Sequence, residues 1–323
     1  MEAAERAVLS PAALVGDLLS GTRDVIAITG ATGWFGRTTL ELLFSALGDA
    51  AAARVLAYGS RPGRVRLSTG HSVAVRPLHE LATVLPSPTV VLHFACLTRD
   101  RESELGTPAY LQANLGITAT VLRALEAHSP RLLVATSSGA AAQYGGAPGL
   151  DLENNAYGTL KRLDELALGQ LAEQRGTGYA IPRVYSVAGP WMTKPTSYAL
   201  GSMITMAQAG GPVTISAQRP VWRSYCGVDE VIALSLWMAA ERANTVFDTS
   251  GHVVEMAGLA AAVADTVGGG CGTSRPEFDA EAAPDLYVGD PTVYEQAART
   301  VGLRPASLEE LVTSTATAFG MIR

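Results

Sequence analysis

The sequence predicts an α/β protein whose large domain is a doubly wound parallel sheet, followed by a smaller C-terminal α/β lobe. Short apolar runs rich in β-branched residues alternate with helical patterns along the first half of the 323 residues. These runs are continuously apolar, as expected for parallel strands buried on both faces. The first run ends in three glycines directly before a helical pattern. Strands and helices that alternate at this spacing form right-handed βαβ units.

The first strand, the loop after it and the next helix form the most informative segment. Residues 25–29 are apolar, Gly30, Gly33 and Gly36 follow, and apolar residues recur at helical spacing over 40–47. A pyrophosphate binds bare backbone N–H groups at a helix N-terminus, where the helix dipole is positive. A side chain at Gly30 or Gly33 would hold the phosphate away, and Gly36 lets the helix pack close to the strand. The segment therefore predicts a dinucleotide-binding loop.

The remaining elements follow in order along the chain. Residues 14–19 suggest a short surface helix before the first strand. His93 lies inside an apolar strand and is expected to be a core histidine with a hydrogen-bond partner. Further strands are predicted at 54–58, 71–75, 89–95 and 131–136, and further helices around Asn114, from Tyr157, and over 199–209, 231–238 and 258–267.

Composition excludes several classes of function. The net charge is −6 and no block of basic residues could follow a nucleic-acid backbone, so nucleic acid is not expected as a partner. The three cysteines are scattered and the five histidines form no ligand pattern, which predicts reduced thiols and no metal site. The first residues are acidic, unlike a secretory signal, and no apolar run approaches the ~18 residues of a membrane span. We expect a cytoplasmic protein.

The turn after the second predicted strand bears on the cofactor. An acidic residue here usually binds the ribose 2′-hydroxyl of NAD, whereas arginine suits the 2′-phosphate of NADP. No Asp or Glu lies between Arg54 and Leu78. Ser60 and Arg61, helped by Arg37 or Arg64, can bind a dianion with charge assistance. The sequence thus favours NADP(H), and NAD(H) stays open.

Tyr157 and Lys161 carry the predicted chemistry. They are four residues apart at the start of a helical pattern, so both side chains project from one face. A phenol with a pKa near 10 can donate a proton to a carbonyl oxygen at neutral pH, and a nearby ammonium stabilises the phenolate that remains. The pair follows a glycine-rich loop and a strand that ends in serines, which makes a chance occurrence a poor explanation.

With these motifs the chain resembles the extended short-chain dehydrogenase/reductase family, the NAD(P)-dependent sugar epimerase/dehydratase group. The resemblance covers about residues 24 to 320, in the family's order and spacing. It implies a Rossmann domain of residues 24–187 plus 226–255, a substrate-binding lobe of 188–225 plus 256–323, and an N-terminal extension of 1–23. The matching segments are 29–36, 91–95, 114–116, 136–138, 157–161, 183–190, 223–230 and 290–311.

The resemblance also implies roles for single residues. Ser138 would hydrogen-bond the substrate, Tyr157 would be the general acid or base, and Lys161 would bind the nicotinamide ribose and lower the pKa of the tyrosine. Arg223 would bind the diphosphate of a nucleotide sugar, with Ser186 beside it. Two subunits would pair through the helix after Asn114 and the Tyr157 helix into a homodimer. The other implied cofactor contacts are Gly30, Thr32, Gly33, Trp34, Phe35, Gly36, Phe94, Ala95 and Val184.

Three departures from the family pattern narrow the function. Sugar dehydratases have an Asp–Glu pair after the catalytic Ser or Thr, and this chain has Gly139 and Ala140, which disfavours dehydration. Ser186 stands where an asparagine usually contacts the substrate phosphates, which weakens the assignment to nucleotide sugars. Arg76–Leu78 replaces the acidic residue that usually holds adenine.

The prediction for function is an NADPH-dependent ketoreductase that acts on a keto group of a nucleotide-sugar-like substrate, with Tyr157 as the general acid. A nucleotide-sugar epimerase that retains its cofactor is the first alternative, because the same residues serve both reactions. A small natural-product ketone or aldehyde stays open as substrate because of Ser186. A non-catalytic NADP-binding regulator is the second alternative, and the intact Tyr157 and Lys161 argue against it.

Overall fold

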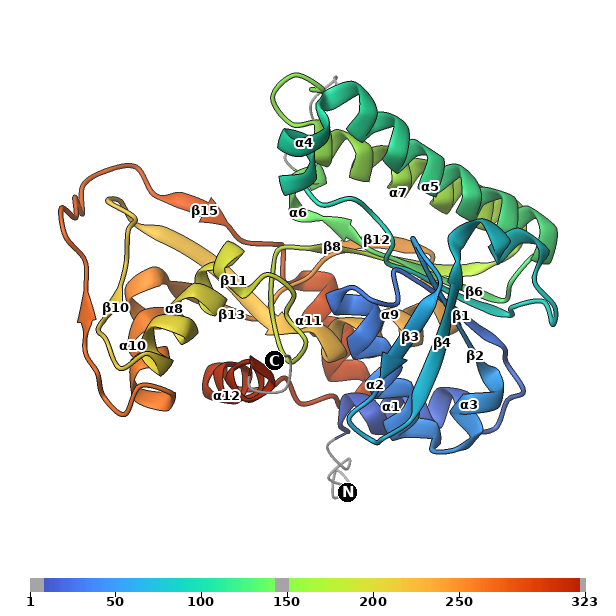
Figure 1. The fold of residues 1–323 in the computed structure, drawn as a ribbon, viewed down its shortest axis with the longest axis horizontal. Coiled ribbons are helices and arrows are strands. Elements are labelled where there is room, and N and C mark those ends of the chain that lie inside the picture. Colours follow the sequence, from blue (N-terminus) through green and yellow to red (C-terminus); the bar gives the residue numbers. More distant parts are fainter. Residues whose placement is uncertain (1–8, 143–150, 320–323) are drawn as a thin grey trace, which may run out of the picture.

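The computed structural model describes residues 9–142 and 151–319. Parts of the predicted N-terminal extension (1–8), Rossmann domain (143–150) and substrate lobe (320–323) therefore lie outside the described residues. Two sheets organise the described part, a large one and a smaller one (Figure 1).

The large sheet has the predicted doubly wound, mostly parallel topology. Within the described residues it holds nine strands, and the neighbouring strands run parallel except β3 and β4. In spatial order the strands are β12 (Thr245–Asp248), β8 (Gly178–Val184), β6 (Leu132–Ala135), β5 (Val90–His93), β1 (Ile26–Thr29), β2 (Val55–Gly59), β4 (Ser72–Pro77) and β3 (Gly63–Arg66), with β7 (Ser137–Ser138) beside β8.

Helices cover both faces of the large sheet (Figure 1). Ile26 and Ile28 of β1 pack into one hydrophobic cluster, and Ala27 between them packs into a second cluster on the opposite face. Both faces are therefore buried, which explains the continuously apolar strands. One face is covered by α1 (Pro11–Leu19), α2 (Trp34–Leu47) and α9 (Val228–Ala240), and the other by α5 (Thr107–His128) and α7 (Ala156–Gln174).

The short segments connect these layers. They are α3 (Ala50–Arg54), the 3-10 helix η1 (Leu78–Thr83), α4 (Asp100–Leu105), α6 (Gly139–Ala142) and α11 (Thr292–Val301).

The smaller sheet lies beside the large one. Its strands are β9 (Ser186–Ala188), β11 (Val221–Gly227), β13 (His252–Glu255) and β15 (Asp285–Tyr287), and the short pair β10 (Val213–Thr214) and β14 (Thr273–Ser274) lies nearby. The helices of this part are η2 (Pro195–Ser197), α8 (Ala199–Gln208), α10 (Met256–Thr266) and α12 (Leu308–Phe319).

The chain crosses between the sheets more than once. β11 belongs to the small sheet, β12 to the large sheet, and β13 to the small sheet again. The predicted domain limits, which assign residues 226–255 to the large domain, stay a prediction, and the observed pairing puts β13 with the small sheet.

One expectation about a single element was confirmed and another element was missed. The short surface helix expected before the first strand is α1, which leaves Ala13 and Asp17 exposed and buries Leu14, Val15 and Leu19 against α2 and α9. The turn expected after β2 contains β3, which pairs antiparallel with β4. Val65 is buried, and Arg64 and Arg66 are exposed. This single alternation of exposed and buried positions is too short to predict a strand from the sequence.

Candidate active site

The glycine-rich loop joins β1 to α2 as predicted. Gly30 has φ of +69°, and a Cβ there would lie 2.8 Å from the backbone N of Ala95. A Cβ on Gly36 would lie 2.2 Å from the carbonyl oxygen of Gly30. Both positions therefore require glycine, because the neighbouring backbone leaves no room for a Cβ. At Gly30 the obstacle is the backbone of the loop after β5, whereas the sequence analysis expected it to be the phosphate.

The N-terminus of α2 carries no side-chain cap. Gly33 is the N-cap residue and supplies no capping oxygen, so the first N–H groups of the helix are available to an external acceptor. Beside them, Thr29 Oγ1 accepts hydrogen bonds from the backbone N of Phe94 and Ala95, both at 3.2 Å, which fixes the loop after β5. Free N–H groups at the N-terminus of a helix form a typical binding site for an anionic phosphate.

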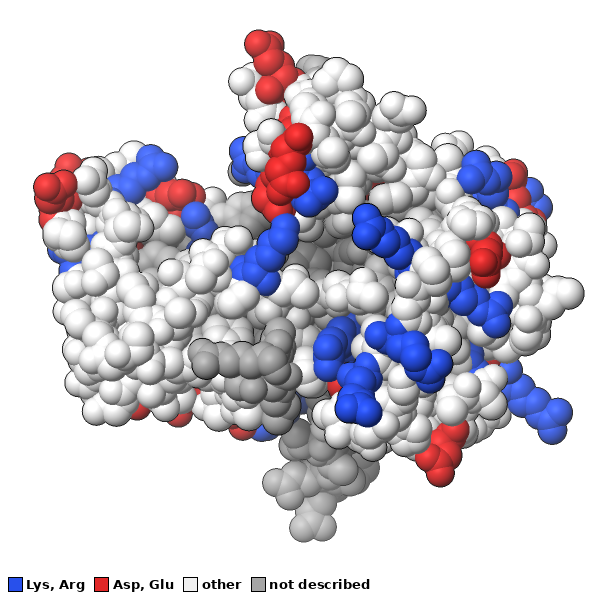
Figure 2. Space-filling view, viewed as in Figure 1, with Lys and Arg blue, Asp and Glu red and all other residues white. Residues whose placement is uncertain are grey.

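A cavity of about 770 Å³ opens between the glycine loop, α7 and the small sheet. It brings together residues from distant parts of the chain, and Figure 2 shows the molecule hollowed between its two halves. The lining includes most of the predicted site residues: Gly30, Gly33, Trp34, Phe35, Gly36, Phe94, Ser138, Tyr157, Lys161, Val184, Ser186 and Arg223.

Tyr157 and Lys161 occupy the first turns of α7, and the start of this helix is fixed by Asn155. The side-chain oxygen of Asn155 accepts from Gly158 N at 3.0 Å, and its amide nitrogen donates to Ala140 O at 3.2 Å. A Cβ on Gly158 would lie 2.6 Å from that same carbonyl oxygen, so glycine is required next to Tyr157. These contacts bring Tyr157 up to the end of β7, where Ser138 lies.

The electrostatics of the pair follow from its burial. Burial raises the pKa of Tyr157 above its ordinary value, while the charge of Lys161 and a hydrogen bond with Ser138 oppose the rise. Burial by itself lowers the pKa of Lys161, but its neighbours Cys96 and Asp164 help to raise it overall. Lys161 Nζ also donates to Thr136 O at 3.1 Å. At neutral pH the site therefore holds a protonated phenol beside an ammonium.

Two buried groups near the pair are structural. His93 is buried and contacts Thr29 Oγ1 at 2.7 Å, which confirms the expected core histidine with a hydrogen-bond partner, and burial lowers the pKa of His93 to about 4. Glu165 is 2% exposed and accepts hydrogen bonds from Ser137 at 2.6 Å and from Arg183 at 2.8 and 2.9 Å. This buried ion pair ties α7 to β7 and β8.

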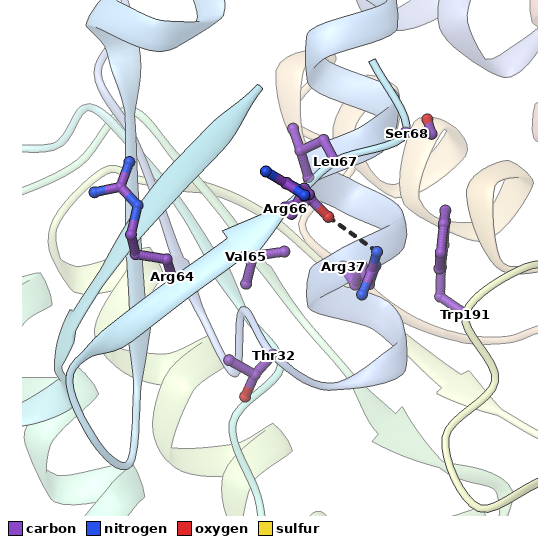
Figure 3. Close-up of a pocket in the computed structure, with 8 residues that line it drawn as sticks. All are labelled: Thr32, Arg37, Arg64, Val65, Arg66, Leu67, Ser68 and Trp191. Carbon is purple, nitrogen blue, oxygen red and sulfur yellow. Dashed lines mark hydrogen bonds between the residues drawn. The ribbon is translucent and has the colours of Figure 1, made fainter. Parts of the chain in front are cut away.

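A second pocket of about 460 Å³ lies beside α2 and β3, and basic side chains gather over this region (Figures 2 and 3). Arg37 Nη2 donates to Arg66 O at 2.9 Å, and its guanidinium lies 3.9 Å from the centre of the Trp191 ring. Its Nε is buried without a hydrogen-bond partner among the described residues. Arg64 also lines this pocket (Figure 3), and its Nε donates to Ser72 Oγ at 2.9 Å.

Of the residues predicted to bind a 2′-phosphate, Arg37 and Arg64 line this second pocket, and Thr32, predicted as another cofactor contact, lines it as well. Ser60 and Arg61 are exposed at the end of β2 and are not in the lining of either cavity. A Cβ on Gly59 would lie 4.0 Å from Thr32 Oγ1, so the end of β2 borders the pocket. The sequence analysis gave Arg37 only a supporting role beside Ser60 and Arg61, whereas the structure places Arg37 in the lining of the pocket.

The wall of the cavity also carries paired charges. Arg223 forms a two-pronged ion pair with Asp285, with Nη1–Oδ1 and Nη2–Oδ2 distances of 3.2 Å. Lys194 pairs with Asp100 from the other wall, and Arg99 lines the cavity near them.

Tyr287 is the main site residue that the sequence did not reveal. Its hydroxyl lies 3.4 Å from Ser138 Oγ, and its ring packs 4.8 Å from that of Tyr185. It comes from β15, a strand of three residues that follows an irregular stretch, so no local pattern marked it. A phenol from the small sheet thus reaches the serine of the large one.

The donor set fits a dinucleotide and offers nothing for a metal. The uncapped N-terminus of α2 and the Tyr157–Lys161 pair line the main cavity, and the buried unpartnered guanidinium nitrogen of Arg37 belongs to the second pocket, beside the start of the same helix. Within residues 9–142 and 151–319, no group of three or more His, Cys, Asp or Glu could hold a metal ion. No helix in this part of the chain is long and apolar enough to cross a membrane.

Comparison with known proteins agrees with this geometry. Residues 26–250 match the model of the "NAD dependent epimerase/dehydratase family". No match is found among curated proteins.

Solved structures show the same fold at low identity. A UDP-N-acetylglucosamine 4-epimerase from Methanobrevibacter ruminantium M1 is 18% identical with a TM-score of 0.70, and the match covers 93% of this chain and 99% of that one. A UDP-glucose 4-epimerase from Thermotoga maritima is 20% identical, with a TM-score of 0.67 and coverage of 92% and 99%. The protein RMD from Pseudomonas aeruginosa, complexed with NADPH, is 18% identical, with a TM-score of 0.66 and coverage of 93% and 100%. The chain is therefore a Rossmann-fold enzyme of the extended short-chain dehydrogenase/reductase type and belongs to the NAD dependent epimerase/dehydratase family.

Proposed function

We propose that the chain is an NADPH-dependent ketoreductase that acts on the keto group of a nucleotide-sugar-like substrate. The observation that carries the proposal is the convergence of Ser138, Tyr157 and Lys161 on one cavity with the uncapped N-terminus of α2. When bound, the nicotinamide cofactor would supply a hydride to the carbonyl carbon of the substrate. The residues of the chain would bind the cofactor, orient the substrate and supply the proton.

Each residue has a distinct task in this proposal. Trp34 and Phe35, in the first turn of α2, offer backbone N–H groups to the pyrophosphate, Gly33 leaves the helix start uncovered, and Lys161 binds the nicotinamide ribose. Ser138 orients the substrate carbonyl, and Tyr157 donates its phenolic proton to the carbonyl oxygen. Because burial raises the pKa of Tyr157, the phenol is present as the acid throughout the neutral range. General acid catalysis of this kind contributes about 10²- to 10⁴-fold.

The preference for NADPH is supported by the second pocket. Arg37 is held there with one buried nitrogen unpartnered, Arg66 lines the same pocket, and no acidic residue lies between Arg54 and Leu78. An acid in this region would repel a 2′-phosphate, and an arginine binds it with charge assistance. NAD(H) is the alternative, since some structures with this fold were solved with NAD.

A nucleotide-sugar-like substrate is supported by the cations on the far side of the cavity. Arg223, Lys194 and Arg99 line it, and α8 begins there without a side-chain cap. Asp285 and Asp100 pair with two of these cations, so a diphosphate would have to compete with them. Several structures with this fold contain UDP-sugars.

An epimerase is the second candidate because two of the structures with this fold are 4-epimerases. The experiment that separates the two is cofactor stoichiometry. We expect the chain to consume one NADPH per ketone reduced across a panel of 4-keto nucleotide sugars, whereas an epimerase turns over without added NADPH.

The decisive variant is Tyr157→Phe, which removes the acid and keeps the ring. We expect turnover to fall by about 10²-fold or more while NADPH affinity changes little. Full activity in this variant would remove Tyr157 from the proposed role.

A homodimer is also proposed, built by α5 and α7. These helices lie side by side on the outside of the large domain (Figure 1), and each exposes a leucine: Leu115 is 47% exposed and Leu166 is 51% exposed. Apolar side chains on two adjacent helices suit pairing with a second copy into four helices.

A further inference from the structure

Asp164 lies less than one helical turn after Lys161 on α7, and the proposed mechanism gives it no task. Its Oδ2 is 3.4 Å from Lys161 Nζ. Its Oδ1 accepts a hydrogen bond from Thr118 Oγ1 of α5 at 2.6 Å. The side chain of Asp164 is 14% exposed and that of Lys161 is 4% exposed. The carboxylate is therefore held against the ammonium inside the protein, where solvent screens the pair poorly.

The groups that face this pair come from four elements. The phenols are neutral at pH 7, and His93 is neutral because its pKa is lowered to about 4. Asp164 is the carboxylate among the described groups that face Lys161 and Tyr157. The facing groups are His93 from β5, Cys96 from the loop after β5, Tyr110 from α5, Ser138 from β7 and Tyr287 from β15.

A buried ammonium next to a tyrosine favours loss of the phenolic proton, since it stabilises the phenolate. A carboxylate 3.4 Å from the same ammonium offsets part of its charge. We infer that Asp164 is a positioning residue that lessens the effect of Lys161 on Tyr157, adds to burial in keeping the phenol protonated, and makes the site a better proton donor than proton acceptor.

This bias has a consequence for the direction of the reaction, which rests on the proposed function. Reduction of a ketone needs Tyr157 to give its proton to the new alcohol oxygen. Oxidation of an alcohol needs a Tyr157 phenolate to take the proton from it. An epimerase needs both within one cycle, so Asp164 favours reduction over epimerisation.

The test uses the full chain labelled with [13Cζ]tyrosine. The 13Cζ resonance distinguishes phenol from phenolate, and Tyr157→Phe assigns the Tyr157 signal. Asp164→Asn removes the charge and keeps the shape and the acceptor for Thr118. We expect its Tyr157 titration midpoint to lie about 1 pH unit below that of the parent chain.

Two matched variants separate charge from packing. Thr118→Val removes the hydrogen bond and keeps the carboxylate, and Asp164→Glu keeps the charge. We expect both midpoints to stay close to the parent value. An unchanged midpoint in Asp164→Asn, or an equal shift in Thr118→Val, would overturn the inference.

Kinetics supply the second arm. Asp164→Asn is expected to raise the rate of alcohol oxidation at pH 8 relative to ketone reduction several-fold. A titration shift without any NADPH-dependent reduction by the parent chain would uphold the charge effect and reject the proposed function. The expected shift together with an unchanged ratio of the two rates would reject the directional consequence.

Discussion

The guanidinium of Arg37 lies over the ring of Trp191 at 3.9 Å, and the same guanidinium donates to the carbonyl oxygen of Arg66. Arg37 is on α2, Arg66 ends β3, and Trp191 lies in the segment that follows β9 of the small sheet. Three elements thus hold one cation at the mouth of the second pocket. Because these contacts already hold the guanidinium in place, the side chain of Arg37 would lose less conformational entropy when a phosphate binds.

The first prediction concerns this cation. Arg37→Ala is expected to weaken NADPH binding by about 10- to 100-fold, since a hydrogen bond to a charged group contributes about 1.5–3 kcal/mol. NADH lacks the 2′-phosphate, so its affinity is expected to stay within about twofold. The measurement is calorimetric titration with both cofactors.

Arg299→Ala is the control, because Arg299 lies on α11, pairs with Glu295 and lines neither cavity. An equal loss for NADPH and NADH in Arg37→Ala would contradict the role of Arg37 in choosing the cofactor.

A second prediction concerns Tyr287, whose hydroxyl is 3.4 Å from Ser138 Oγ. Tyr287→Phe is expected to lower kcat by about 3- to 10-fold, the value of one neutral hydrogen bond that orients the serine. Tyr185→Phe serves as control, because the Tyr185 hydroxyl donates to Asp248 and not to the serine. An effect confined to KM in Tyr287→Phe would assign Tyr287 to substrate binding alone.

The third prediction is a pH dependence of stability that originates at His93. Its pKa is about 4 in the folded chain and about 6.5 when unfolded, so above pH 6.5 the residue is neutral in both states. As the pH falls from 6.5 to 4, the unfolded chain takes up the proton first. The free energy of unfolding is then expected to fall by up to about 3 kcal/mol.

Urea denaturation of the parent and of His93→Asn at several pH values isolates this contribution from that of the carboxylates. The difference between the two curves should change between pH 6.5 and 4 and stay level above pH 7. Parallel curves over the whole range would show that His93 does not contribute.

The fourth prediction tests the dimer. Combining Leu115→Glu with Leu166→Glu places two carboxylates on each proposed contact face and is expected to give a monomer in light scattering. Leu85→Glu, at an exposed leucine outside α5 and α7, is the control and should leave the mass unchanged. A parent chain that is already monomeric would refute the proposed homodimer.

The parts of the site that the sequence predicted are those encoded by local spacing. The glycines of the loop stand at fixed spacing within one βα turn, and Tyr157 and Lys161 are one turn of helix apart, so the sequence marks these residues even though the backbone that requires Gly30 lies in the distant loop after β5. Parallel strands buried on both faces are also readable, because their apolar character is continuous. These features need no knowledge of distant contacts.

The parts that were missed depend on segments far apart in the chain. Tyr287 reaches Ser138 across 149 positions. Trp191 meets Arg37 only because Pro190 O accepts from Trp34 Nε1 at 2.8 Å, which fixes that linker on α2. The two-residue alternation of β3 was too short to outweigh the turn signal of Pro62 and Gly63.

The route of the chain from β11 through β12 to β13 makes the two sheets inseparable as fragments. A single cut between β11 and β12 leaves strands of both sheets on each of the resulting pieces, and a cut between β12 and β13 leaves β9 and β11 of the small sheet with the large one. Neither half corresponds to one contiguous stretch that a gene could gain, lose or exchange on its own. Substrate specificity in this architecture therefore has to diverge by replacement of residues and loops in place.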